Sequence, residues 1–188
     1  MFRQDKFKAL VLYFLRLAGG KVKGRTRLAK WVLYADLEAY RSRGKSITGD
    51  LYVRETHGPI PAHFYDVLDD LKESGLLQET LEPMDEVMVV VYSLKSPGEI
   101  AGLTEEEQRI ARKVYEESRD HTGARLSRET HTLPAWKYAE PGDPIHIAEL
   151  AITDEETYQR YQELLEDIED SDRDVLEILK VLQKKPSP

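Results

Sequence analysis

The sequence predicts an α+β fold that is predominantly helical, a compact helical domain with a small antiparallel sheet or hairpin. Apolar residues recur at three- and four-residue spacing over most of the chain, which is the period of one helix face. Two short apolar runs at 76–81 and 87–93 flank a turn signal and predict the hairpin. The 188 residues include no cysteine, which excludes disulfides, thiolate metal sites and cysteine nucleophiles.

Apolar stripes that end at glycines predict the first two helices. One stripe covers 7–17 and stops at positions 19–20, because glycine adopts the left-handed helix cap without steric penalty. The second helix begins at Thr26, carries its stripe over 28–35 and closes at Gly44. Its tryptophan lies on that stripe, which favours core packing.

The middle of the chain changes period. Alternation at 51–53 predicts a short strand, and the two prolines of 58–61 exclude a helix there, since proline disfavours helical geometry in the residue before it. A stripe at 64–71 predicts a helix that ends at Gly75. The β-branched run 89–91 predicts a strand covered on both faces.

Capping signals mark the helices of the last third. Thr104 with Glu107 forms a capping box, in which a hydroxyl and a carboxylate each satisfy a free backbone amide. A short helix is expected around 124–130. Thr153 with Glu156 predicts a second capping box, which opens an acidic helix.

These boundaries predict one domain over 1–153 and an acidic helical extension over 154–188. The extension carries two apolar stripes, which consist of Tyr158, Tyr161, Leu165 and Ile168, and of Val175, Ile178, Leu179 and Leu182. Stripes this regular bury against another surface, which is either the body of the domain or a partner.

Charge is distributed unevenly along the chain. Residues 1–45 hold 12 Lys and Arg against 3 Asp and Glu, whereas residues 46–153 hold 10 against 21. The basic start either complements the acidic segments within the fold or faces phosphate or an acidic protein. Helices followed by a hairpin are also compatible with a winged-helix-like unit that binds nucleic acid. The net charge of −8 does not favour that alternative, because nucleic-acid-binding domains are usually basic.

Several kinds of chemistry have no signature here. The chain contains no glycine-rich phosphate loop and no Gly-x-Ser-x-Gly nucleophile elbow. Its five histidines do not fall at metal-ligand spacing. We therefore predict no catalytic residue, no metal and no cofactor, and a protein that is not an enzyme. The longest apolar run, 9–14, is far below the roughly 20 residues of a membrane span, and we expect a cytoplasmic location.

An ordered set of motifs carries a family resemblance. The motifs are Arg27-Leu28-Ala29-Lys30-Trp31-Val32-Leu33-Tyr34-Ala35-Asp36, Ser46-Ile47-Thr48-Gly49-Asp50, His57-Gly58-Pro59-Ile60-Pro61 with Phe64-Tyr65, and Leu126-Ser127, Thr130-His131 and Trp136. In this order they resemble the Panacea domain, the SocA-like antitoxin family found in phage-associated proteins. The resemblance runs from about 28 to 147, some two thirds of the chain. The family's Lys-Leu-x-Lys pattern here begins with arginine, which keeps the charge and changes the hydrogen-bonding group.

The resemblance implies an antitoxin that binds a cognate protein toxin encoded by a neighbouring gene. Members of the family either neutralise the toxin by direct binding or act as adaptors that deliver it to a protease. We favour direct stoichiometric binding, and the adaptor and a DNA-binding, autoregulatory protein stay open as alternatives. No membrane partner is expected.

Partner contacts are expected on 48–61 and 126–136, where most of the matching polar and rigid residues lie. Pro59 after a glycine fixes a bend, either as a plain strand-to-helix connection or as a rigid loop for a partner. Trp136 is the kind of side chain that dominates interface hot spots. The candidate partner-binding residues are Tyr34, Asp36, Thr48, Asp50, His57, Pro59, Tyr65, His131 and Trp136.

Overall fold

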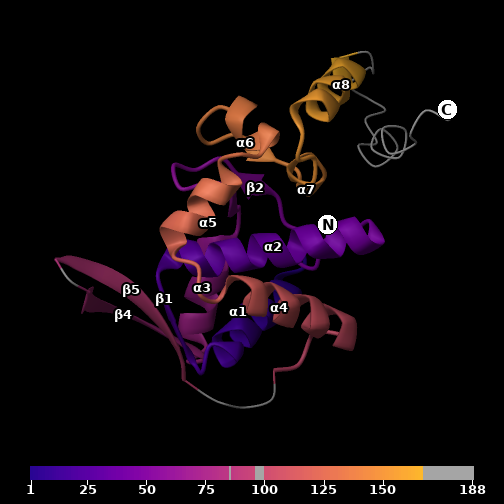
Figure 1. The fold of residues 1–188 in the computed structure, drawn as a ribbon. Coiled ribbons are helices and arrows are strands. Elements are labelled where there is room, and N and C mark those ends of the chain that lie inside the picture. The colour runs from indigo at the N-terminus through magenta and orange to yellow at the C-terminus, as the bar shows by residue number, and fades with distance from the viewer. Residues whose placement is uncertain (85, 96–99, 167–188) are drawn as a thin grey trace.

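A computed structural model describes residues 1–84, 86–95 and 100–166, and it confirms a predominantly helical α+β fold (Figure 1). Helices surround one long central helix, and a three-stranded antiparallel sheet projects from one side. No helix in the described part of the chain is long and apolar enough to cross a bilayer.

The central helix is α2 (Arg25–Arg43), and it is buried on all sides. It begins one residue before the predicted start and ends, as predicted, at Gly44, whose φ of 72° is the left-handed cap. Eleven of its residues are buried, including Lys30 and Asp36. A helix with a single apolar stripe has one side that faces solvent. More of α2 is therefore buried than its apolar stripe predicts.

Four helices pack directly on α2. They are α1 (Gln4–Leu17), α4 (Glu105–Ser118), α5 (Gly123–Thr130) and α7 (Ile147–Leu150). The predicted capping box of α4 is present, with the Thr104 hydroxyl accepting from the Glu107 amide and the Glu107 carboxylate accepting from the Thr104 amide. The predicted short helix is α5, which the Thr122 hydroxyl caps.

The projecting sheet has the strand order β1-β5-β4. Its strands are β1 (Lys21–Lys23), β4 (Leu77–Met84) and β5 (Val87–Leu94), and the last two form the predicted hairpin. Strand β1 was not predicted; it pairs antiparallel with β5, with Val22 opposite Tyr92. With α3 (Phe64–Glu73) the order is helix, strand, helix, helix, hairpin, with the first strand beside the last. That is the topology of a winged helix with an insertion between α2 and α3.

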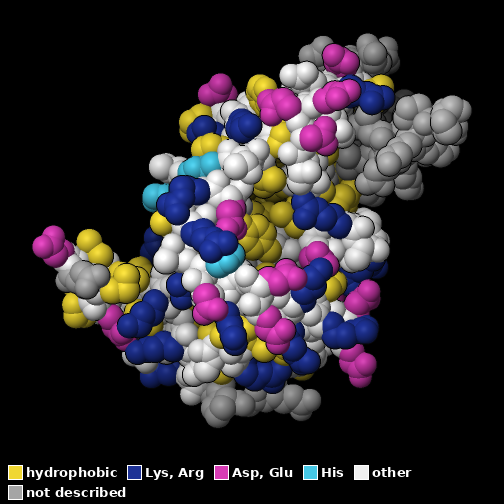
Figure 2. Space-filling view, in the orientation of Figure 1, with side chains coloured by type: hydrophobic (Ala, Val, Ile, Leu, Met, Phe, Trp, Pro, Cys, Tyr) yellow, Lys and Arg dark blue, Asp and Glu magenta, His cyan; other side chains and the backbone are white. Residues whose placement is uncertain are grey.

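The hairpin corrects one prediction. Val91 and Tyr92 are fully buried, but Val89 and Val90 are only half-buried, because they lie toward the hairpin turn, which projects from the body (Figure 1). The far end extends beyond the body, and Figure 2 shows hydrophobic side chains gathered there. The exposed apolar residues of this end are Leu81, Met84, Val87 and Met88.

A second small sheet ties the insertion to the last third of the chain. Its strand order is β3-β2-β6, and its strands are β2 (Tyr52–Val53), β3 (Ile60–Pro61) and β6 (Pro144–Ile145). Strand β2 matches the predicted strand at 51–53, while β6 was not predicted. Two residues of β6 carry too little pattern to predict a strand; the pairing with β2 defines it.

The C-terminal part builds a second hydrophobic cluster against the far side of α2. Helices α6 (Pro134–Tyr138) and α8 (Glu155–Glu166) contribute to it, and the Tyr158 ring stacks on Tyr138 with centroids 5.7 Å apart. Tyr161 is 1% exposed. The described part of the extension therefore packs on the body. The boundary at 153 stays a prediction, and Ile168 and the stripe at 175–182 lie outside the described residues.

The start of α8 differs from the predicted capping box. The helix begins at Glu155, and the Asp154 carboxylate accepts from the Thr157 amide at 2.8 Å. Aspartate therefore caps the helix one residue after the predicted Thr153. Both residues are good caps, so local sequence alone could not choose between them.

Burial of α8 predicts that it contributes to global stability. Tyr161→Ala should lower the free energy of unfolding by about 3 kcal/mol or more, because it opens a cavity in a closed cluster. Urea denaturation measures the change. Arg160→Ala, on the exposed side of the same helix, is the matched control and should stay within about 0.5 kcal/mol. Equal effects of the two substitutions would contradict the packing of α8 on the body.

Candidate functional site

The buried Asp36 carboxylate fixes the start of the insertion. It is 0% exposed and accepts hydrogen bonds from the Ile47 amide at 2.7 Å, the Thr48 amide at 2.9 Å and the Tyr52 hydroxyl at 2.8 Å. The Thr48 hydroxyl donates to it as well. Burial raises the pKa of Asp36, and these hydrogen bonds oppose that rise. The carboxylate thus holds the loop against α2.

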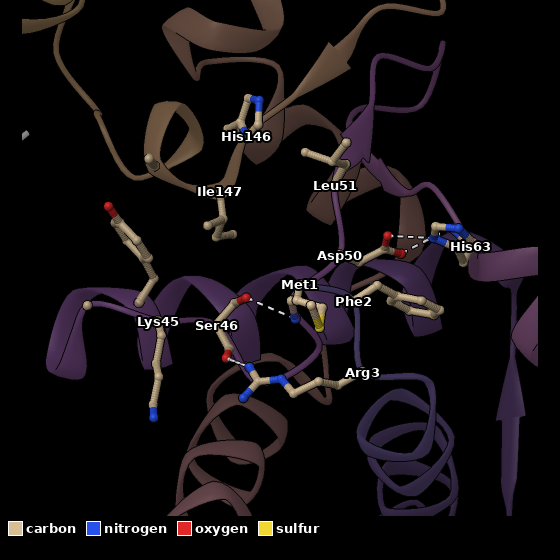
Figure 3. A pocket seen from close by; sticks show the side chains of 14 residues that line it. Met1, Phe2, Arg3, Lys45, Ser46, Asp50, Leu51, His63, His146 and Ile147 are labelled. Atoms are coloured by element: carbon tan, nitrogen blue, oxygen red, sulfur yellow. Dashed lines mark hydrogen bonds and ion pairs between the residues drawn. The ribbon is translucent and has the colours of Figure 1, made fainter. Parts of the chain in front are cut away.

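A second aspartate orients the other end of the loop. The Asp50 carboxylate accepts from the His63 amide at 3.0 Å, and its other oxygen lies 2.7 Å from His63 Nδ1. The His63 ring stacks on Phe2 with centroids 4.2 Å apart. These side chains lie at one end of a pocket of about 730 Å³ between the 44–51 loop and α7, where Asp50 and His63 point toward each other (Figure 3).

The two segments expected to contact a partner meet on one face. The Arg54 guanidinium carbon lies 4.7 Å from the centroid of the Trp136 ring, and Arg54 Nε donates to the Trp136 carbonyl. The indole N–H of Trp136 donates to the Glu55 carbonyl at 3.0 Å. On the ring, His131 stacks at 3.9 Å with an interplanar angle of 9°. We call Arg54, His131 and Trp136 the stacked cluster.

Lys30 lies beneath this face, and its ammonium is unusual because it is buried. The residue is 1% exposed, and its ammonium donates to the Pro59 carbonyl at 2.6 Å. Among the described residues no carboxylate lies within ion-pair distance of it. Burial lowers the pKa of Lys30 to about 7. Burial and the nearby Lys30 charge also lower the pKa of His131.

Gly58 allows the insertion to approach Lys30 closely. Its φ is +88°, a conformation that side chains disfavour, and a Cβ there would collide with the Thr130 hydroxyl and the Lys30 ammonium. The bend is therefore required both by backbone conformation and by space. Beside it lies a pocket of about 180 Å³, which we call the Lys30 pocket.

Comparison with known proteins bears directly on these segments. The family model described as antitoxin SocA-like, Panacea domain, matches residues 28–137. The chain belongs to this family. Neither a curated protein nor a solved structure matches it. The match confirms the resemblance and includes Lys30, the stacked cluster and Gly58, whereas α1 and β1 precede it.

The nine candidate partner-binding residues of this Panacea domain fall into two groups according to their burial. Four are buried: Asp36, Thr48, Asp50 and Pro59. These residues position the loop through buried hydrogen bonds, and their role as direct partner contacts stays a prediction. The other five reach the surface at least in part: Tyr34, His57, Tyr65, His131 and Trp136. Of these, His57 and Tyr65 line the Lys30 pocket.

Sequence reasoning missed Lys30 and Arg54 as site residues. A signal for Lys30 was present, because a lysine inside the run Leu28-Ala29-Lys30-Trp31-Val32-Leu33 indicates a charge enclosed by apolar neighbours. Arg54 had no such signal, because its position over an indole depends on a contact 82 residues away along the chain.

Half of the cations in the basic first 45 residues are paired within the fold. These six cations pair with carboxylates from later segments, in the pairs Lys6–Glu107, Lys8–Asp70, Lys21–Glu82, Lys23–Glu82, Arg25–Glu79 and Arg43–Glu106. Figure 2 shows basic and acidic side chains interleaved on the face in view. This supports internal complementarity as the reason for the uneven charge.

The site holds no group of three metal-ligating side chains, and the same is true throughout the described residues. An antitoxin-like family suggests a non-enzymatic role. The stacked cluster is aromatic and cationic, which are the side-chain types enriched in protein interfaces.

The buried ammonium predicts a pH dependence of stability. The unfolded chain keeps Lys30 protonated up to about its ordinary pKa of 10.5, whereas the folded chain releases the proton near 7. Between these values the unfolded state binds more protons, so the free energy of unfolding rises with pH. Burial also raises the pKa of Tyr52. That shift makes the free energy of unfolding fall as the pH rises, but only above about pH 10.

Urea denaturation at pH 7 and pH 9 tests the predicted rise in the free energy of unfolding. Lys45→Met, an exposed lysine beyond the other end of α2, should behave as wild type. Parallel profiles for wild type and Lys30→Met would contradict the lowered pKa.

Proposed function

We propose that this Panacea domain neutralises a protein toxin encoded by a neighbouring gene through direct stoichiometric binding. The family match supports an antitoxin role in general. The observation that carries the finer proposal is the convergence of 48–61 and 126–136 on one face, centred on the stacked cluster.

The stacked cluster has the properties of an interface anchor. Trp136 is half-buried, and its polar N–H and the Arg54 guanidinium are already held by backbone carbonyls. Because these groups are fixed before binding, little side-chain entropy is lost on association. Tryptophan and arginine are also the residue types enriched at hot spots.

The stacked cluster alone is smaller than a standard protein interface. A nanomolar complex requires about −12 kcal/mol. A standard interface buries about 1,600 Å² over both partners, so the stacked cluster would form the centre of a contact that includes the surrounding polar rim. Tyr65, 49% exposed, and His57 are candidates for that rim.

Co-expression with the product of the neighbouring gene tests the proposal. That product should stop growth alone and be harmless with this protein, and Trp136→Ala should weaken the purified complex at least tenfold, because it removes the anchor. Lys137→Ala, exposed on the same short helix, is the control and should retain affinity. A harmless product, or one still toxic when co-expressed, would overturn the proposal.

Toxin lifetime separates the two antitoxin mechanisms. Direct occlusion leaves the lifetime of the toxin unchanged or lengthens it. A protease adaptor shortens it, so rapid loss of the toxin in pulse-chase experiments would replace direct binding by delivery.

The winged-helix topology favours nucleic-acid binding as a second candidate function. The charge of α3 opposes it. In the related helix-turn-helix arrangement the corresponding helix enters the major groove, whereas here α3 carries four carboxylates and one lysine, in the sequence Phe64-Tyr65-Asp66-Val67-Leu68-Asp69-Asp70-Leu71-Lys72-Glu73. Carboxylates facing phosphates repel them.

The salt dependence of DNA binding tests whether the protein binds nucleic acid. We expect filter binding to duplex DNA to be undetectable at micromolar protein even at low salt, because α3 presents no basic surface. A retained complex that weakens steeply between 50 and 200 mM salt would establish phosphate contacts and contradict this expectation.

A further inference from the structure

The Lys30 pocket concentrates positive charge around a small space. Lys30 lies at its base, and Arg25 and His57 also line it. Glu55 is the one acidic residue among its lining residues in the described chain. The Arg25 guanidinium lies 5.3 Å from the centroid of the Tyr65 ring and 3.8 Å from a Glu79 carboxylate oxygen, so part of its charge is already paired. The enclosed Lys30 ammonium is therefore the main reason to expect an anionic occupant.

The Lys30 ammonium is only partly satisfied by the fold. An ammonium has three N–H donors, and the described residues accept one of them, through the Pro59 carbonyl. The residue is 1% exposed, so its ammonium has little contact with bulk water. A buried charge with one neutral acceptor is costly, and folded proteins normally pair it with an opposite charge.

We propose that the Lys30 pocket binds the carboxylate of an acidic side chain that the protein partner inserts beside the stacked cluster. This inference rests on the proposed direct binding of a partner. A carboxylate has two oxygens, so one can accept from Lys30 while the other faces Arg25. The hydrogen bond to Lys30 would be charge-assisted and enclosed by the pocket.

Size and surroundings favour a side chain over a larger anion. The pocket holds about 180 Å³, below the roughly 300 Å³ at which pockets for drug-sized ligands begin. It also adjoins Tyr65 at the start of the acidic helix α3, which disfavours a polyanion such as nucleic acid. A single carboxylate on a protein surface satisfies both limits.

Titration of the isolated full chain with Ac-Glu-NH2 tests the pocket at pH 6.5, where Lys30 is largely protonated. The signals of the Gly58 amide and the Trp136 indole N–H should shift in ¹H–¹⁵N spectra and saturate at millimolar ligand. Ac-Gln-NH2, which has the same shape without the charge, should bind at least tenfold more weakly. Equal shifts with both probes would overturn the proposal.

Variants locate the binding. Lys30→Met should abolish the saturable shift, and Arg25→Gln, a change at a half-exposed residue that does not threaten folding, should weaken it severalfold. Lys45→Met should leave it unchanged. Saturation that persists in both Lys30→Met and Arg25→Gln would overturn the proposal, as would tighter binding of inorganic phosphate than of Ac-Glu-NH2.

The complex with the neighbouring gene product gives the second readout. Lys30→Met should weaken that complex at least tenfold, and Lys45→Met should not. Unchanged affinity of Lys30→Met would overturn the partner assignment while the antitoxin function stands. If no complex forms at all, the proposed function fails and the partner assignment falls with it, while the titration still reports whether the pocket binds a carboxylate.

Discussion

The hydrogen bonds to the buried Asp36 carboxylate determine where the whole insertion lies. They hold the loop at 46–52 against α2, and strand β2 continues directly from that loop. Because β2 pairs with both β3 and β6, the same anchor sets the position of the Gly58 bend and of the last third of the chain. Removing this carboxylate would leave several donors unsatisfied in the interior, which costs more than any single hydrogen bond contributes. The stacked cluster and the Lys30 pocket thus depend on a residue that neither contains.

Sequence periodicity predicted the elements that carry their own pattern and missed those that long-range pairing creates. The glycine caps and apolar stripes located α1 and α2, and the Thr104 box located α4. Strand β1, by contrast, is three residues with charged ends, and only its pairing with β5 makes it a strand. The same limit applies to the site. Motif order identified the two segments that meet, but burial of Asp36 and Asp50 and the position of Arg54 follow from contacts between distant residues.

The winged-helix topology favours nucleic-acid binding, whereas the charge of the surface opposes it. A winged-helix arrangement is a backbone property, and one fold can carry unrelated functions. Binding to DNA, however, draws most of its affinity from phosphate contacts, which need cations on the surface that faces the groove. Here half of the cations in the basic first 45 residues pair with carboxylates of the fold, and α3 is acidic. The charge distribution therefore does not favour the nucleic-acid binding that the topology alone would suggest.

Lys30 links the stability of the domain to its recognition surface. Folding removes the ammonium from water without supplying a carboxylate from the described residues, so the desolvation of this charge is borne by the free protein. An acidic group that enters the pocket then gains the charge pair without a second desolvation of the lysine. Preorganisation of this kind raises affinity and specificity together, because a neutral side chain in the same place would leave the ammonium unpaired.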